Sequence, residues 1–148
     1  PEKSFKYLNE ETMQKQFLVN VIGPAMIIKN FSKFLPKHSN SIFFTLSARV
    51  GSISDNNLGG WMSYRASKAA LNQIVRSASI ELAARYPSAI CVAIHPGTVR
   101  SKLTQRYLSR YKSMEPEESA RKIIACLGDL SLSDSGKFFD YNGKLIEW

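Results

Sequence analysis

Tyr64 and Lys68 stand four residues apart in the segment Tyr64-Arg65-Ala66-Ser67-Lys68. Residues at this spacing share one face of a helix, so a phenol and an ammonium group would meet there. A free tyrosine has a pKa of about 10, and a neighbouring cation favours its charged form. The pair is therefore a candidate for acid/base catalysis, although the same spacing also occurs on ordinary solvated helix faces.

The surrounding pattern predicts a strand, a helix and a second strand. Residues 41–47 and 89–96 are apolar runs typical of buried strands, and residues 62–86 have the apolar period of a helix of about seven turns. Strands joined in this way are parallel, and ligands of open α/β sheets lie at the carboxyl ends of the strands. Ser47 and Pro96-Gly97 occupy those ends. We therefore expect them to meet Tyr64 and Lys68 at one edge of the sheet.

A further polar feature lies upstream, where residues 10–35 have helical spacing but contain Gly23-Pro24. Proline has no N–H to bond the carbonyl four residues back, which belongs to Asn20. A released carbonyl needs a partner such as an ordered water. The alternative is a kink that only fits the helix to its neighbours.

Taken together, four segments resemble the short-chain dehydrogenases/reductases in order and spacing: residues 20–24, the strand ending in Leu46-Ser47, residues 64–68 and residues 95–99. Within that family, residues 49–53, Gly59-Gly60 and residues 64–72 resemble the branch of C-factor-type signalling proteins and sniffer-type carbonyl reductases. The resemblance implies an α/β fold, the C-terminal half of a Rossmann-like doubly wound parallel sheet, with residues 1–148 as one unit.

The resemblance also implies an NAD(P)-dependent oxidoreductase that interconverts a carbonyl and a secondary alcohol by hydride transfer. On this analogy Tyr64 is the acid/base, and Lys68 binds the nicotinamide ribose and lowers the tyrosine pKa. Ser47 would hold the substrate carbonyl, and Asn20 would position a relay water.

Cofactor binding is implied for Tyr64 and Lys68 and for four residues at the end of the second strand. The cofactor would be NADP or NAD, with NADP favoured by the resemblance. The four residues, which would bind the carboxamide end of the nicotinamide, are Pro96, Gly97, Val99 and Ser101.

Two departures from the family pattern qualify these expectations. Family members usually carry two adjacent serines here, with the second catalytic, and Ala48 takes that second place. Side chains alternate along a strand, so Ser47 can serve only if the strand ends or bulges there, and Ser52 is the alternative. The chain also starts at Pro1, near the family's fourth helix, and its 8 glycines form no Gly-x-x-x-Gly-x-Gly cluster. We expect the C-terminal part of a dehydrogenase, inactive in isolation.

Two other classes of function remain open. The first is a non-catalytic signalling or binding protein of C-factor type, and the second is a truncated dimerisation module. The helices expected at residues 10–35 and 62–86 carry more apolar positions than one face against a sheet requires. We therefore expect self-association through them, and the resemblance implies a homodimer or homotetramer.

Composition agrees with a soluble, cytoplasmic globular chain, with 44% apolar and 22% charged residues. No apolar stretch is long enough for a membrane span. The net charge of +8 is spread along the chain without an aromatic-stacking motif, so nucleic acid is not an expected partner. His38 and His95 lack metal-ligand spacing, and no metal is expected. The cysteines, Cys91 and Cys126, are expected to be small buried hydrophobes.

The C-terminal third completes the expected architecture. Residues 116–129 open on a proline and two glutamates and predict a helix, and residues 137–148 predict a strand followed by a turn and a short returning strand or tail. Residues 101–114 carry apolar residues at near-helical spacing. The resemblance implies a lid over the substrate there, and a surface helix is the alternative.

Overall fold

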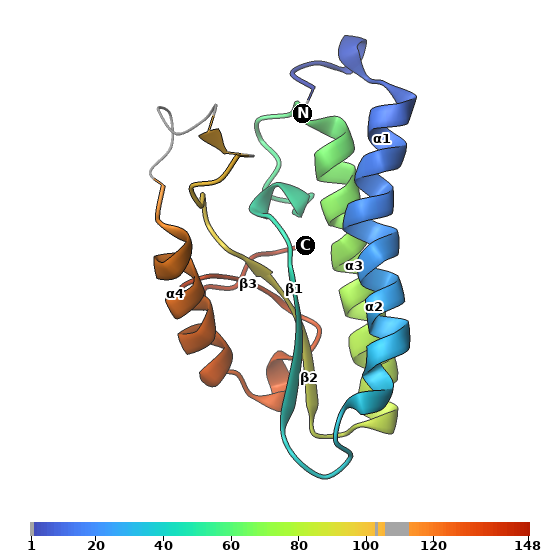
Figure 1. The fold of residues 1–148 in the computed structure, drawn as a ribbon, viewed down its shortest axis with the longest axis vertical. Helices are drawn as coiled ribbons and strands as arrows, with labels where there is room; N and C mark the ends of the chain where they lie inside the picture. Colours follow the sequence, from blue (N-terminus) through green and yellow to red (C-terminus); the bar gives the residue numbers. More distant parts are fainter. Residues whose placement is uncertain (1, 103, 106–112) are drawn as a thin grey trace.

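The computed structural model describes residues 2–102, 104, 105 and 113–148, which form a three-stranded parallel sheet between two helical layers (Figure 1). The sheet runs in the order β1 (Ser41–Leu46), β2 (Ala89–His95) and β3 (Phe138–Asp140). Ser41 pairs with Ala89 and Leu46 with Ile94, so β1 and β2 are aligned along their length. The predicted strand, helix and strand are thus present as a parallel unit.

Helices cover both faces of the sheet (Figure 1). The long helix α3 (Met62–Arg85) packs on one face, through a core that joins Leu71 and Val75 to Cys91 and Phe138. The helix α4 (Pro116–Gly128) packs on the other face, against the opposite side chains of β2. Because both of its faces are covered, β2 is apolar at every position but the last and is buried throughout except at His95.

A bent helical segment lies outside α3 (Figure 1). It consists of α1 (Glu10–Phe17), a π-helical turn η2 (Leu18–Ile22) and α2 (Gly23–Phe31), and it continues into the 3-10 turn η3 (Ser32–Phe34). The side-chain oxygen of Asn9 caps α1 by accepting a hydrogen bond of 2.9 Å from the N–H of Thr12. The irregular turn falls immediately before Pro24, where proline was predicted to interrupt the helical bonds.

The remaining described elements are short. They are the 3-10 turns η1 (Phe5–Tyr7), η4 (Arg49–Gly51) and η6 (Leu132–Asp134), and an antiparallel bridge that pairs Phe139 with Leu145 after β3. Most of the segment 101–114 lies outside the described residues. Cys91 and Cys126 are buried free thiols, as predicted. None of the helices that the structure describes is long and apolar enough to cross a membrane.

Candidate active site

Tyr64 and Lys68 lie in the first two turns of α3. The start of α3 lies at the same end of the sheet as the carboxyl end of β1 (Figure 1). The Nζ atom of Lys68 donates a hydrogen bond of 3.0 Å to the carbonyl of Leu46, the last residue of β1. The same Nζ atom is 5.8 Å from the centroid of the Tyr64 ring. Lys68 is only 8% exposed, so its ammonium group is largely removed from water. The two residues are therefore close together at the sheet edge where the sequence predicted them.

Burial changes the proton affinities of both groups. It raises the pKa of the Tyr64 phenol and lowers the pKa of the Lys68 amine, because each charged form loses hydration. The direction for Tyr64 is opposite to the lowering that we expected from a neighbouring cation. The physical reason is desolvation, because burial removes the water that would stabilise the phenolate. At neutral pH Tyr64 thus keeps its proton and is able to donate it.

Asn20 lies in the π-helical turn and contacts α3 through its side chain. Its Nδ2 atom donates to the hydroxyl of Ser67 at 3.1 Å and to Oε1 of Gln16 at 2.8 Å. The Ser67 hydroxyl donates in turn to the carbonyl of Tyr64 at 2.9 Å. The backbone carbonyl of Asn20 has Pro24 at the i+4 position and cannot make the ordinary helical bond. Asn20 is thus attached to the residue that precedes Lys68, and its role in a water relay stays a prediction.

Ser47 directly follows the end of β1, so the predicted end of the strand is present. By the alternation of the strand its side chain lies on the α3 face, as Phe43 does. The Ser47 hydroxyl, however, donates to Oδ1 of Asn72 at 2.6 Å, one helical turn beyond Lys68. Ser52 is also buried, and its hydroxyl accepts the N–H of Asp55 at 3.1 Å. Both hydroxyls have partners other than Tyr64, so the choice between them stays open.

Asn72 is a contact residue that the sequence reasoning missed. Its position four residues after Lys68 places it on the same face of α3, and this spacing was the available signal. Besides accepting from Ser47, it donates from Nδ2 to the carbonyl of Gly51 at 3.4 Å. Gly51 lies so close to α3 that a Cβ atom there would be 2.8 Å from the Cβ of Lys68. These contacts fix the turn η4 against the helix that carries the candidate pair.

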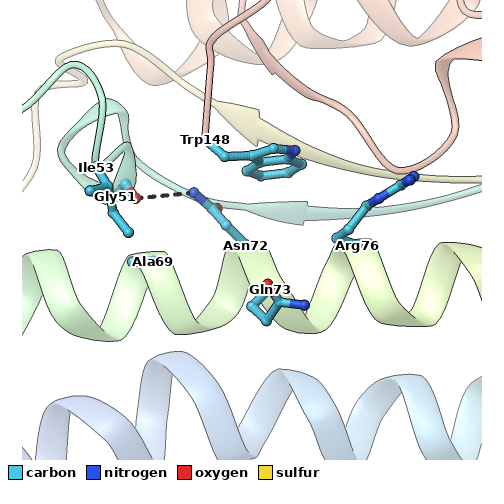
Figure 2. Close-up of a pocket in the computed structure, with 7 residues that line it drawn as sticks. All are labelled: Gly51, Ile53, Ala69, Asn72, Gln73, Arg76 and Trp148. Carbon is cyan, nitrogen blue, oxygen red and sulfur yellow. Dashed lines mark hydrogen bonds between the residues drawn. The ribbon is translucent and has the colours of Figure 1, made fainter.

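A cavity of about 140 Å³ lies next to this contact (Figure 2). Figure 2 shows the side chains of Asn72 and Arg76 on one side of it and the indole of Trp148 on the other. None of the predicted catalytic residues lines the cavity. Its lining residues are Gly51, Ile53, Ala69, Asn72, Gln73, Arg76 and Trp148.

The predicted cofactor-binding residues after β2 lie together on one loop at the carboxyl edge. The carbonyl of Pro96 accepts a 2.8 Å hydrogen bond from the Ser119 hydroxyl on α4. Gly97 has a φ of 82°, and a Cβ atom there would be 2.8 Å from the ring of Tyr141. Val99 pairs with Met114, and the exposed Ser101 has its hydroxyl 3.1 Å from that of Thr104. Gly97 thus has a physical reason to be glycine.

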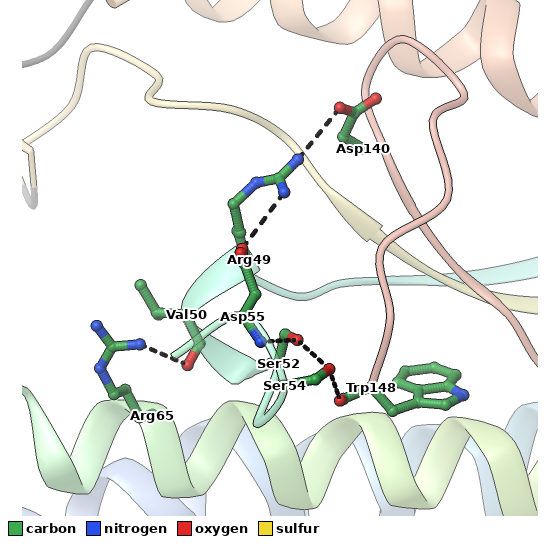
Figure 3. Close-up of polar contacts among 8 residues, drawn as sticks. All are labelled: Arg49, Val50, Ser52, Ser54, Asp55, Arg65, Asp140 and Trp148. Atoms are coloured by element: carbon green, nitrogen blue, oxygen red, sulfur yellow. Dashed lines mark hydrogen bonds and ion pairs between the residues drawn. The ribbon is translucent and has the colours of Figure 1, made fainter. Parts of the chain in front are cut away.

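Two arginines, Arg49 and Arg65, hold the loop between β1 and α3 in place by hydrogen bonds and ion pairs (Figure 3). Arg65 donates from Nη1 to the carbonyl of Val50 at 3.3 Å and from Nε to the carbonyls of Gly59 and Gly60 at 3.2 and 3.0 Å. Arg49 forms 3.4 Å ion pairs with Asp55 and with Asp140, the last residue of β3. The side chain of Arg49 is 43% exposed, so these pairs stabilise the loop only weakly. The start and the end of the loop are nevertheless both fixed.

His95, at the end of β2, borders the same edge. Burial and, to a smaller extent, the positive charge of Arg49 lower the pKa of its imidazole to about 4, although the negative charge of Asp140 acts in the opposite direction. The imidazole is therefore neutral at pH 7. The packing role of His95 stays a prediction.

Comparisons with known proteins show to which protein family the chain belongs. The sequence model of the short chain dehydrogenase family matches residues 1–112, more than half of the chain. The chain is 30% identical over 141 residues to the 1-hydroxy-2-glutathionyl-2-methyl-3-butene dehydrogenase of Rhodococcus sp. (strain AD45), a match that covers 95% of this chain and 61% of that protein. It is 31% identical over 136 residues to the C-signal of Myxococcus xanthus, covering 92% and 78%.

A comparison of the fold with solved structures supports the same family. The NADPH-bound carbonyl reductase from chicken fatty liver superimposes with a TM-score of 0.88 and 28% identity, covering 100% of this chain and 62% of the reductase. The chain therefore belongs to the short-chain dehydrogenase family, and its sheet and helices are part of a Rossmann-like α/β fold, as predicted. It spans about three fifths of the length of the Rhodococcus dehydrogenase and the chicken reductase.

Proposed function

We propose that this chain is the catalytic part of an NAD(P)-dependent oxidoreductase that interconverts a carbonyl and a secondary alcohol. The observation that carries the proposal is the placement of Tyr64 and Lys68 on α3, with Lys68 bonded to the carboxyl end of β1. Such an edge is where open α/β sheets bind their ligands. A dehydrogenase and an NADPH-bound carbonyl reductase among the similar proteins support the same activity.

The described residues fit the nicotinamide end of such a cofactor. An ammonium group carries three N–H donors, so Lys68 can bond a ribose hydroxyl as well as the carbonyl of Leu46. Pro96, Gly97, Val99 and Ser101 would lie against the carboxamide. NADP is the favoured form, because the similar carbonyl reductase contains NADPH.

When bound, the nicotinamide supplies the hydride for reduction or accepts it for oxidation. Tyr64 would then donate its phenolic proton to the carbonyl oxygen, and its raised pKa keeps that proton in place at neutral pH until the substrate binds. Lys68 would return a proton to Tyr64 and would also hold the ribose when the cofactor is bound. The carbonyl of Asn20, which has no N–H to bond at Pro24, would hold the water that connects Lys68 to solvent. The hydroxyl of Ser47 or of Ser52 would orient the substrate carbonyl. To do so, it would give up its present hydrogen bond, to Asn72 for Ser47 or to the N–H of Asp55 for Ser52.

Enzyme assays at different pH values test this function. In the full-length protein with NADPH, we expect carbonyl reduction to be level through neutral pH and to fall only at a pH above the ordinary tyrosine pKa of about 10, because burial raises the pKa of the Tyr64 phenol. Oxidation of the alcohol needs the phenolate, so its rate should rise with pH over the same alkaline range. Stopped assays in both directions, with cofactor oxidation or reduction as the readout, measure the two profiles. A reduction rate that climbs with pH would contradict the role of Tyr64 as proton donor.

A signalling role without catalysis is the second candidate. It is favoured by the similarity to C-signal and by Ala48 in the place of the second serine. Absence of cofactor-dependent turnover across a panel of aldehydes, ketones and secondary alcohols, in a protein that binds NADPH, would favour this candidate.

Self-association through α1, α2 and α3 is part of the proposal, with a homodimer or homotetramer as the product. The outer helices carry six apolar side chains that are between 45% and 63% exposed: Leu18, Val19, Ile22, Met26, Ile27 and Phe31. Ile80 on α3 is 61% exposed as well. Packing this apolar surface against a second copy of the chain would remove these side chains from water and would stabilise the assembly.

Sedimentation at micromolar concentration tests the self-association. We expect a dimer or tetramer for the wild type and a shift toward monomer for Ile80→Lys, because a charge would be buried at the contact. Ile124→Lys is the matched control, since Ile124 is 69% exposed on α4, on the opposite face of the sheet. A monomeric wild type, or equal effects of the two substitutions, would contradict the proposed surface.

A further inference from the structure

Three consecutive left-handed residues precede α3. Gly59, Gly60 and Trp61 have φ values of 61°, 64° and 51°. Glycine adopts this region freely, whereas any residue with a Cβ is disfavoured in it, and such residues cluster at functional sites. Trp61 is the only described non-glycine residue with a positive φ. The backbone therefore holds a large aromatic side chain in a conformation that its own geometry disfavours.

Neighbouring groups hold this segment in place. Arg65 donates to the carbonyls of Gly59 and Gly60, and the N–H of Trp61 donates to the carbonyl of Glu2 at 2.6 Å. The helix α3 follows at once, and the N–H of Arg65 bonds the carbonyl of Trp61 at 2.8 Å. The position of Trp61 is thus fixed on both sides by backbone bonds rather than by its side chain alone.

The indole of Trp61 lies edge-on to the phenol ring of Tyr64, with ring centroids 6.4 Å apart and an angle of 63° between the planes. This is a favourable geometry for two aromatic rings. A carbonyl compound that accepts the proton of Tyr64 must place its substituents around that ring. One of them would lie beside the indole.

We infer that Trp61 forms an aromatic wall of the substrate site and that the site prefers carbonyl compounds with a flat aromatic group next to the carbonyl. The inference rests on the proposed function, because it assumes that the reacting carbonyl binds at Tyr64. Trp61 itself is a specificity-determining residue and takes no part in proton transfer.

Two aldehydes of the same ring size test the wall. Benzaldehyde carries a flat aromatic ring and cyclohexanecarbaldehyde a saturated one, so the ratio of their kcat/KM values reports ring stacking. An aromatic contact has an energy that corresponds to a factor of roughly three to ten. In the full-length protein we expect Trp61→Leu to lower the ratio by about this factor and Trp61→Phe to preserve it within about twofold. Trp148→Phe is the control, because Trp148 stacks on Phe138, with the ring centroids 5.6 Å apart.

Ligand binding without turnover provides a second readout. Benzaldehyde should quench the indole fluorescence of the wild type saturably, and the quenching should be lost in Trp61→Phe and retained in Trp148→Phe. An unchanged ratio in Trp61→Leu together with equal quenching in Trp61→Phe would overturn the inference. Equal loss of activity toward both aldehydes would also overturn it, since Trp61 would then only support Tyr64. Quenching that depends on Trp61 without turnover of either aldehyde would support the wall and contradict the proposed reduction.

Discussion

Replacing Tyr64 with Phe is expected to lower the turnover of the full-length enzyme by 100- to 10,000-fold. A positioned general acid or base contributes a factor of roughly this size, and Phe keeps the ring while removing the proton. The edge-on contact with Trp61 involves only the ring, so the fold around the site should be retained. Steady-state kinetics with a confirmed carbonyl substrate and NADPH measure the effect, and it should fall on kcat more than on KM.

The opposite end of the same helix provides a matched control. Tyr86 is the C-terminal capping residue of α3 and packs against the core on that side of the sheet. Tyr86→Phe also removes one phenolic hydroxyl, and turnover within about threefold of the wild type is expected. If Tyr64→Phe behaves like Tyr86→Phe, Tyr64 is not the acid/base and the proposed proton transfer is wrong.

Replacing Gly51 with Ala is expected to lower the free energy of unfolding by about 1–3 kcal/mol, the usual cost of overpacking. The added Cβ would lie 2.8 Å from the Cβ of Lys68 and 2.9 Å from its carbonyl carbon. Neither atom belongs to the free end of a side chain, so the turn η4 must move away from α3. The hydrogen bond from Asn72 to the Gly51 carbonyl would lengthen with it. Urea unfolding curves measure the loss, and turnover should fall because Lys68 and the loop between β1 and α3 are displaced.

Gly128→Ala is the control for this substitution. Gly128 is the last residue of α4, and a Cβ there has no atom within 4 Å. Alanine is a better helix former than glycine, so stability should be unchanged or slightly raised. Wild-type stability of Gly51→Ala would mean that the loop lies farther from α3 than the structure shows.

Local pattern was sufficient to predict the main elements. The apolar period predicted a helix over residues 62–86, and α3 extends over Met62–Arg85. The runs at 41–47 and 89–96 became β1 and β2, and the strand–helix–strand order predicted that they are parallel. Proline at position 24 predicted the break in the helical bonding, because its missing N–H is a covalent property. The helix, the strands and the break have causes within a few neighbouring residues, whereas the parallel pairing follows from the order of the elements along the chain.

The partners of the polar groups depended on contacts between distant segments. The sequence placed Ser47 at the end of a strand, but the bond to Asn72 joins residues 25 positions apart and depends on how α3 is rotated against β1. The bond between Asn20 and Ser67 joins residues 47 positions apart in the same way. The pKa of Tyr64 is raised because packing removes water, a change that the spacing to Lys68 could not reveal.

The sequence by itself therefore determined which elements form, where the helix breaks and which edge of the sheet gathers Tyr64, Lys68 and the loop after β2. Period, chain order and the covalent geometry of proline act locally, so they can be read along the chain. Only the tertiary structure decided which hydroxyl bonds which amide, how far Tyr64 and Lys68 lose their hydration, and that Trp61 adopts a left-handed backbone beside Tyr64. These features depend on how packed surfaces fit together, and close packing fixes them only when all the elements are in place.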